Sequence, residues 1–306
     1  MSERAHDHPL RRFWLLLLAT LFAGTAALAA PLPVMILDGE SAGTYHRWDQ
    51  TTPVLRRALE DTGLFSVDVV TAPSAGADFS SFQPRFDRYR AVVVNYDAPD
   101  GRWPAALQAG FERYVKRGGG VVMVHAADNA FPGWKAWNQM NGVGGWRGRD
   151  ERAGPWWHYE HGRMVADASP GAAGSHGRRD PFIVIVRADH PITRGLPAMF
   201  MHGGDELYAH LRGPGLHMTV LATAWSDPAN AGSGRHEPQL MVLRYGRGRI
   251  FHTTLGHDVA AMSSVDFVVT LQRGTEWVAT GRVTQPVPPD FPAASVRVRQ
   301  GISSIH

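Results

Sequence analysis

The sequence predicts an α/β domain with a mainly parallel sheet, helices on both faces of that sheet, and one long loop insertion. Short apolar runs alternate with amphipathic helical stretches between Pro33 and Asp128, which is typical of a parallel sheet flanked by helices. The run at 91–94 is unbroken and β-branched, as expected of a strand covered on both faces. Regularity is lost between Phe131 and Pro181, and ordered loops of that length usually cover a site.

The elements of the first half follow from this alternation. The first strand is expected at 34–37, and the next helix should begin near Thr52 with Pro53 in its first turn. A second helix should begin near Pro104 and end at the glycines of 118–120, because apolar residues recur at helical spacing between them. The other strands expected in this half are 65–70, 91–94 and 121–124.

Strands resume after the long loop, and a closing helix is expected at 264–277. A tight hairpin at 245–248 should join the last two strands. The strands expected in this half are 182–186, 218–222, 240–243 and 249–253. The domain should therefore span 33–281, and the tail at 282–306, rich in Pro and Val, should be irregular.

Residues 1–29 have the layout of a secretory signal peptide. Arg11 and Arg12 precede an apolar run that is short for a bilayer, and Ala27-Leu28-Ala29 supplies the small residues of a cleavage site. We expect cleavage after Ala29, export to the periplasm or medium, and no stable membrane anchor after cleavage. An uncleaved anchor is the alternative, and the choice between the Sec and twin-arginine routes stays open.

The composition excludes several classes of function. The chain has no cysteine, which excludes disulfides, a lipoprotein anchor, thiolate metal sites and a thiol nucleophile. Loss of residues 1–29 removes three arginines and two acids, so the formal charge falls from +3 to +2. The remaining arginines are scattered without a basic stripe, so no nucleic-acid partner is expected.

Two histidines follow predicted strands directly, where ligands bind in open parallel sheets. His125 follows the strand at 121–124, and Asp97 ends the neighbouring segment. His257 likewise follows the last predicted strand and lies next to Asp258. Asp258 can equally cap the following segment. Imidazoles change charge near neutral pH, so His125 and His257 are candidate catalytic residues.

A third group lies at 202–208, where an imidazole, two carboxylates and a phenol follow one another closely. Asp205 and Glu206 are the candidate carboxylates for acid–base chemistry, although adjacent side chains usually point to different sides. A capped short helix is the alternative.

Six tryptophans lie in irregular segments, at 48, 134, 137, 146, 156 and 157. Aromatic faces in a cleft stack on sugar rings, so this composition mildly favours a small-molecule carbohydrate as partner. The residues expected to bind the substrate are His46, Trp48, Asp97, Trp146, His176, His202, Tyr208 and Asp258. The histidines are too far apart for a local zinc signature; a divalent metal site assembled in three dimensions stays an alternative, and no cofactor is identified.

A serine hydrolase is a further alternative, because Gly39-Glu40-Ser41-Ala42-Gly43 reads as G-x-S-x-G after a strand. In a nucleophile elbow the helix begins at once, whereas here Thr44 to Asp49 intervene. A glycine-rich binding loop is the favoured interpretation of this segment.

The motifs together resemble the ThuA-like (trehalose utilisation) family, with its flavodoxin-like, class I glutamine amidotransferase-like fold. The matching stretches are the loop at 39–48, 119–127 (GGVVMVHAA), 189–197 (DHPITRGLP), 205–208 (DELY), 246–258 (GRGRIFHTTLGHD) and 276–281 (EWVATG). The position of the amidotransferase cysteine matches His125, so the resemblance does not imply glutamine hydrolysis. It implies a substrate among trehalose and related disaccharides, including 3-keto sugars.

Two main hypotheses follow. The first is an exported enzyme, a hydrolase or lyase, in which His125 or His257 moves a proton and Asp205 or Glu206 orients it. Beside a keto group, such proton removal allows bond breakage by elimination. The second is a sugar-binding module without catalysis, in which the same tryptophans and acids only hold the ligand.

Overall fold

The computed structural model describes residues 1, 30–41 and 43–299. The predicted signal peptide, apart from Met1, and the last residues of the tail lie outside the described residues. The fold belongs to the second of two compact units, residues 31–306. Among the described residues, no helix is long and apolar enough to cross a membrane.

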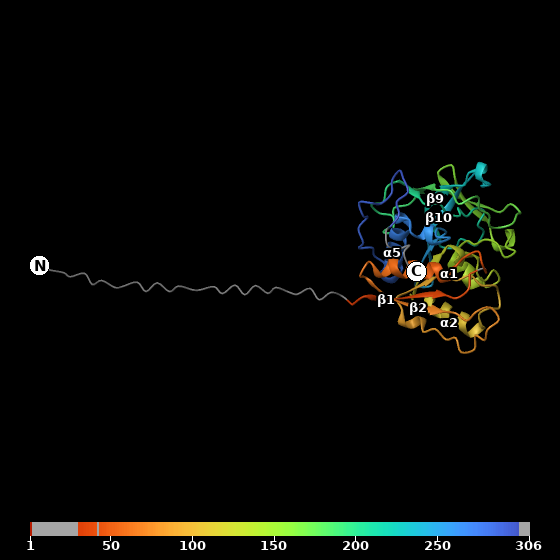
Figure 1. Cartoon of the computed structure of the whole chain (residues 1–306), viewed down its shortest axis with the longest axis horizontal. Helices are drawn as coiled ribbons and strands as arrows, with labels where there is room; N and C mark the ends of the chain where they lie inside the picture. Colours follow the sequence, from red (N-terminus) through yellow and green to blue (C-terminus); the bar gives the residue numbers. More distant parts are fainter. Residues whose placement is uncertain (2–29, 42, 300–306) are drawn as a thin grey trace. The chain divides into compact units, whose positions relative to one another are not determined.

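One sheet organises this unit, and its described residues form eleven strands (Figure 1). Five strands run parallel in the order β2-β1-β3-β4-β11, which is the flavodoxin-like order. Their bounds are β1 Leu32–Asp38, β2 Phe65–Thr71, β3 Ala91–Val94, β4 Gly120–Val124 and β11 Gly248–Thr253. The predicted α/β class with a parallel sheet is confirmed.

The sheet continues beyond β11 as an antiparallel half, in the order β10-β9-β7-β8. The bounds of these strands are β7 Phe182–Val186, β8 Met199–His202, β9 Thr219–Trp225 and β10 His236–Tyr245. The hairpin of β5 (Trp156–Glu160) and β6 (Arg163–Asp167) joins through β10. Four antiparallel steps separate β8 from β11, so these two strands point the same way.

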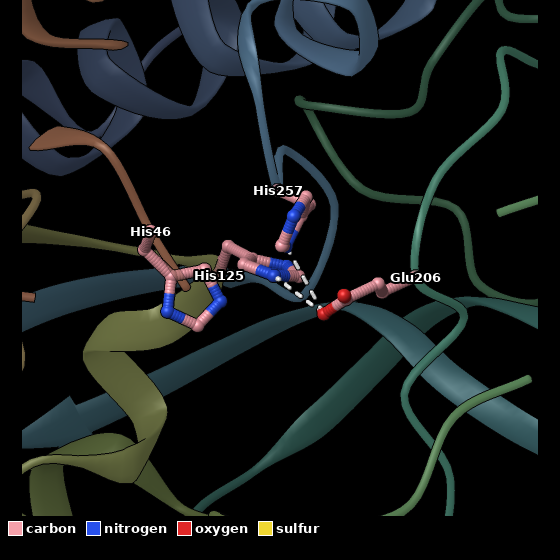
Figure 2. A group of neighbouring side chains, drawn as sticks. All are labelled: His46, His125, Glu206 and His257. Atoms are coloured by element: carbon pink, nitrogen blue, oxygen red, sulfur yellow. Dashed lines mark ion pairs between the residues drawn. The ribbon is translucent and has the colours of Figure 1, made fainter. Parts of the chain in front are cut away.

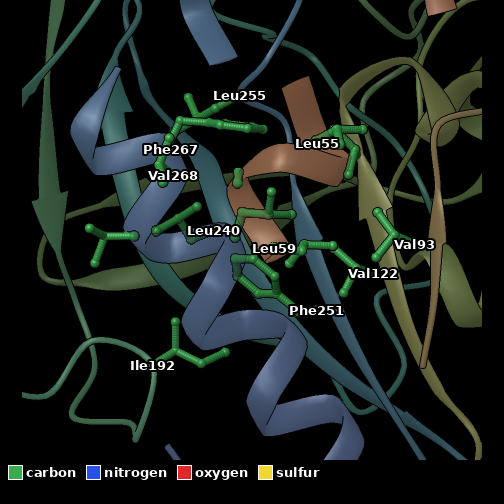
Figure 3. Packing of buried hydrophobic residues seen from close by; sticks show 14 of the residues in the cluster. Leu55, Leu59, Val93, Val122, Ile192, Leu240, Phe251, Leu255, Phe267 and Val268 are labelled. Carbon is green, nitrogen blue, oxygen red and sulfur yellow. The ribbon is translucent and has the colours of Figure 1, made fainter. Parts of the chain in front are cut away.

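Helices cover both faces because alternate strand residues point to opposite sides. Val93 and Val122 pack in one cluster with α1 (Trp48–Glu60) and α5 (Val265–Thr280), as Figure 3 shows. Val92 and Val121 pack in the other cluster with α2 (Ala105–Lys116) and α3 (Lys135–Asn141). The remaining helical elements are α4 Val259–Met262 and the 3-10 turns Phe86–Arg88, His125–Asn129, Glu151–Ala153 and Pro228–Asn230.

Gly119 and Gly120, at the start of β4, allow the strand to pass close to its neighbours. A Cβ at Gly119 would lie 2.3 Å from the ring of Tyr114 in α2, and one at Gly120 would lie 2.7 Å from the carbonyl oxygen of Val278 in α5. Tyr114 donates its hydroxyl to the carbonyl of Gly120 at 2.9 Å. The glycines therefore end α2 and also fix how β4 enters between the two helical layers.

Two sequence-based expectations were wrong in detail, and one strand was not predicted. The first helix begins at Trp48, so Pro53 lies inside it rather than in its first turn. The segment 131–181 is not irregular throughout, because it contains α3 and the β5–β6 hairpin. Trp137 anchors α3 in the core with no exposed surface. Strand β8 was not predicted, since its four residues carry too short a pattern.

Candidate functional site

His125 stands at the carboxyl end of β4, in a strained backbone conformation with φ of 45°. Its Nδ1 lies 2.6 Å from the carbonyl oxygen of Thr254, which follows β11. A carbonyl only accepts, so Nδ1 carries the hydrogen and Nε2 presents a lone pair. That Nε2 lies 3.6 Å from Oε2 of Glu206. The turn after β4 therefore aims one imidazole nitrogen at a carboxylate from a distant segment.

Three imidazoles and Glu206 come together here, and we call them the open cluster (Figure 2). Nδ1 of His257 lies 3.1 Å from Oε2 of Glu206. The ring of His46 lies 5.1 Å from that of His125 and 5.0 Å from that of His257, between centroids. One potential ligand atom from each of the four residues lies within 4.8 Å of the others. The four come from the segments that follow β1, β4, β8 and β11, which all point to one edge of the sheet.

The charges in the open cluster are set by burial and by mutual contact. Burial would raise the pKa of Glu206, but the neighbouring imidazoles of His125 and His257 hold that pKa well below its ordinary range. Glu206 is therefore a carboxylate at neutral pH. Burial, together with the neighbouring His125 and His257, lowers the pKa of His46 to about 3, so His46 is neutral.

A cavity of 560 Å³ opens beside the open cluster, a size common for small-molecule sites. Trp146 lies against Tyr208 with ring centroids 4.6 Å apart, and Tyr208 lies 4.2 Å from the ring of His125. Nε2 of His176 lies 3.7 Å from Oε1 of Glu206. The cavity is lined by Tyr45, His46, Asp97, Asn129, Trp146, Arg147, His176, Glu206 and Tyr208. It thus combines aromatic faces with hydrogen-bonding groups.

Asp97 forms part of the cavity wall beyond the end of β3. Arg147 donates from Nε to Oδ1 of Asp97 at 2.9 Å. Burial raises the pKa of Asp97, and Arg147 opposes that shift. Arg147, Asn129 and Tyr45 line the cavity but were not predicted as site residues. The sequence held a signal for Arg147, because it lies within Gly145-Trp146-Arg147-Gly148 in the segment expected to cover a site.

Asp205 and His202 lie behind the cavity and do not line it. His202 contacts Oδ2 of Asp266 through Nδ1 at 2.7 Å and Oδ2 of Asp205 through Nε2 at 2.9 Å, and all three side chains have no exposed surface. We call these residues the closed triad. Because both ring nitrogens are occupied and buried, His202 cannot reach a substrate.

The closed triad holds the open cluster in place through the backbone. Asp205 accepts hydrogen bonds from the backbone N–H groups of Gly256 at 2.6 Å, His257 at 3.1 Å and Glu206 at 2.8 Å. Burial alone would lower the pKa of His202, but the carboxylates of Asp266 and Asp205 raise it to about 10. Asp205 is therefore a positioning residue, and the imidazolium beside it keeps its carboxylate charged.

Three other candidates lie outside the cavity of 560 Å³. Trp48 begins α1 and is not among the residues that line this cavity. Asp258 caps α4 by accepting from the N–H of Ala261 at 2.9 Å, and it pairs with Arg179 at 2.9 Å. Asp258 lines a neighbouring cavity of 400 Å³, whose wall also includes Glu206 and His257. Ser41 is only 3% exposed and forms a β-bridge with Asp97.

Comparison with known proteins points to one family. The family model for ThuA, described as trehalose utilisation, matches residues 33–278. A ThuA-like protein from Parabacteroides merdae is 43% identical, with a TM-score of 0.84 over 88% of this chain and 98% of its own. A ThuA-like protein from Bacteroides uniformis is 16% identical, with a TM-score of 0.56 over 85% of this chain and 96% of its own, and shares the fold. No curated protein matches the chain.

The family match covers the strand ends and loops that supply the open cluster, the closed triad and the cavity wall. The chain belongs to the ThuA family of carbohydrate-utilisation proteins.

Proposed function

We propose that this protein is an exported enzyme that cleaves an oxidised disaccharide, a 3-keto-glycoside, at its open cluster. The observation that carries the proposal is the convergence of His125, His257 and Glu206 beside an aromatic cavity of 560 Å³. The cavity is large enough to take a sugar ring. Trp146 and Tyr208 offer faces for its apolar side, and Asp97 with Arg147 offers partners for its hydroxyl groups.

The reaction needs no nucleophile. The carbonyl at C3 makes the hydrogen on C2 acidic, and a base in the cluster removes that proton. The electron pair of the C2–H bond forms the C1–C2 double bond, while the C1–O bond breaks and its electrons go to the leaving oxygen. The same base can return the proton to that oxygen, so the products are an unsaturated keto sugar and a free alcohol. The cluster can act by moving the proton itself or by holding an ion that polarises the carbonyl.

The test is incubation of the purified protein with 3-keto-trehalose and product analysis by mass spectrometry. We expect turnover, and a fall of at least about 100-fold in His125→Ala and His257→Ala, because acid–base groups usually contribute 10²–10⁴-fold. Undiminished turnover in both variants would remove the assignment. Binding seen by calorimetry with no product would instead identify a non-catalytic sugar-binding module.

Export is a separate part of the proposal, supported by the signal-like layout of residues 1–29. Expression of the full chain in a Gram-negative host, followed by fractionation and N-terminal sequencing, tests it. The expected product lies in the periplasm or medium and begins at Ala30. A cytoplasmic product that keeps residues 1–29 would contradict export.

A further inference from the structure

We propose that the open cluster binds one divalent transition-metal ion, with His46, His125, His257 and Glu206 as its ligands. The inference builds on the proposed function, because it assigns a cofactor to the same site. It adds to what the cluster does: its side chains would hold an ion that polarises the carbonyl of the substrate.

Several buried ring nitrogens of the open cluster have no hydrogen-bond partner among the described residues. They are Nδ1 of His46, Nε2 of His125 and Nδ1 of His257. Buried polar atoms are nearly always satisfied, so each such atom needs an explanation. Two of them, Nε2 of His125 and Nδ1 of His257, lie beside the carboxylate of Glu206. They share an explanation, because a cation would accept these two nitrogens, the carboxylate and one nitrogen of His46 at once.

Neighbouring groups hold the proposed ligands in place. Metal-bound histidines usually engage their other ring nitrogen with a carbonyl or another polar group, which fixes the ring. His125 places Nδ1 against the carbonyl of Thr254 at 2.6 Å. The hydroxyl of Tyr208 lies 3.3 Å from Nε2 of His46 and helps to orient that ring. Asp205 fixes the backbone of the other two ligands, His257 and Glu206, as described above. The atoms of His125, His257 and Glu206 that lie closest together are thus held in place by contacts made elsewhere in each residue.

The separations between the ligand atoms fit a single ion if the side chains move slightly closer together. With bonds of about 2.1 Å, two ligand atoms on one ion lie at most ~4.2 Å apart. The separations from Glu206 Oε2 to His125 Nε2 and His257 Nδ1, 3.6 and 3.1 Å, already meet this limit. The four-residue group spans up to 4.8 Å, so side-chain rotation must draw it together slightly. Three imidazoles with one carboxylate suit Zn²⁺ and neighbouring first-row ions rather than Mg²⁺ or Ca²⁺.

The experiment measures metal binding without any substrate. The full chain is dialysed against EDTA and then against chelator-free buffer, and Zn²⁺ is titrated in by calorimetry. The variants are His125→Ala, His257→Ala and Glu206→Gln. His161→Ala is the matched control, because the side chain of His161 is 87% exposed. Near-ultraviolet circular dichroism checks that each variant is folded.

We expect one Zn²⁺ per chain in the wild type and in His161→Ala. Affinity should fall at least ~100-fold in the two alanine variants, since even partners in the outer shell of a metal site commonly contribute 10–100-fold. It should fall by about 10-fold in Glu206→Gln, which keeps the shape but loses the charge. Substoichiometric binding in the wild type, or wild-type affinity in the folded variants, would overturn the site. Should an alanine variant fail to fold, unchanged affinity in Glu206→Gln would overturn it.

The outcome separates this inference from the proposed function. Zinc uptake without turnover of 3-keto-trehalose would support the metal site and remove the enzyme. Turnover by the EDTA-treated protein, together with no uptake of Zn²⁺, would keep the enzyme and overturn the metal site.

Discussion

The open cluster and the closed triad lie side by side, and both are built from histidine and carboxylate, yet they are organised in opposite ways. In the closed triad, His202 has a carboxylate at each ring nitrogen and no exposed surface. In the open cluster, His125 and His257 share one carboxylate, Glu206, and each has a ring nitrogen without a hydrogen-bond partner among residues 30–41 and 43–299. Both ring nitrogens of His202 in the closed triad therefore have partners, whereas the open cluster can still accept a proton or a metal ion.

The difference shows how to separate a structural histidine from a functional one. A buried imidazole whose two nitrogens both meet acceptors becomes a fixed cation that stabilises the surrounding backbone. A neutral imidazole with one satisfied nitrogen keeps a lone pair for a proton or a metal ion. Residue type and burial are the same in both cases, so the count of satisfied nitrogens decides.

The largest expected effect is the loss of the closed triad. Asp205→Ala leaves the His202 imidazolium with one carboxylate and removes the acceptor for three backbone N–H groups. Breaking a buried charge pair usually costs about 3–5 kcal/mol. We expect a loss of that size in the free energy of unfolding, measured by urea denaturation. His176→Ala, on the partly exposed rim of the cavity, should lose less than about 1 kcal/mol; equal losses would contradict the division between the two regions.

The second effect concerns pH. The pKa of His202 is about 10 in the folded chain and 6.5 in its ordinary state, so the folded state binds this proton more tightly. The resulting stabilisation is complete below about pH 6.5 and is lost as the pH rises toward 10. The free energy of unfolding should therefore decline across this interval. Nitrogen-15 NMR of labelled histidine should show one imidazolium at pH 8.5, and its absence would contradict the closed triad.

Much of the fold could be predicted from the sequence because its pattern is local. Covered parallel strands give unbroken apolar runs, and the glycines at 118–120 mark the change from helix to strand. Strand β8 and the β5–β6 hairpin were missed, because strands of four and five residues carry only a short alternating pattern.

The site could be predicted only in part. Parallel strand ends meet at one edge, so His125 and His257 could be expected to converge. Which of two adjacent carboxylates faces the cavity depends on backbone geometry around residues 203–206, and only the structure separates Asp205 from Glu206. Trp137 was counted among tryptophans outside the regular elements, yet it anchors α3 in the core.

Replacement of an aromatic residue in the cavity wall should have a smaller effect, on the affinity for sugar. Trp146 stands against Tyr208 and contributes an aromatic face. Trp146→Ala should weaken sugar binding by about 1–2 kcal/mol, or roughly 5–30-fold, because stacked faces contribute on that scale. The dissociation constant for a keto sugar, measured by calorimetry, checks this expectation, and Trp146→Phe should recover part of the loss. The open cluster should keep its affinity for Zn²⁺ in both variants.

The smallest expected effect is that of replacing Ser41 on turnover. This replacement tests whether the reaction takes place at the open cluster. Ser41 is 3% exposed, pairs with Asp97 through a β-bridge, and has no hydrogen bond from its hydroxyl to an imidazole in the described part of the chain. A serine nucleophile requires an adjacent base and an accessible oxygen, so Ser41→Ala should leave turnover within about twofold, and a fluorophosphonate should not label the protein. Loss of activity in a folded Ser41→Ala variant would move the reacting centre from the end of β4 to the loop after β1.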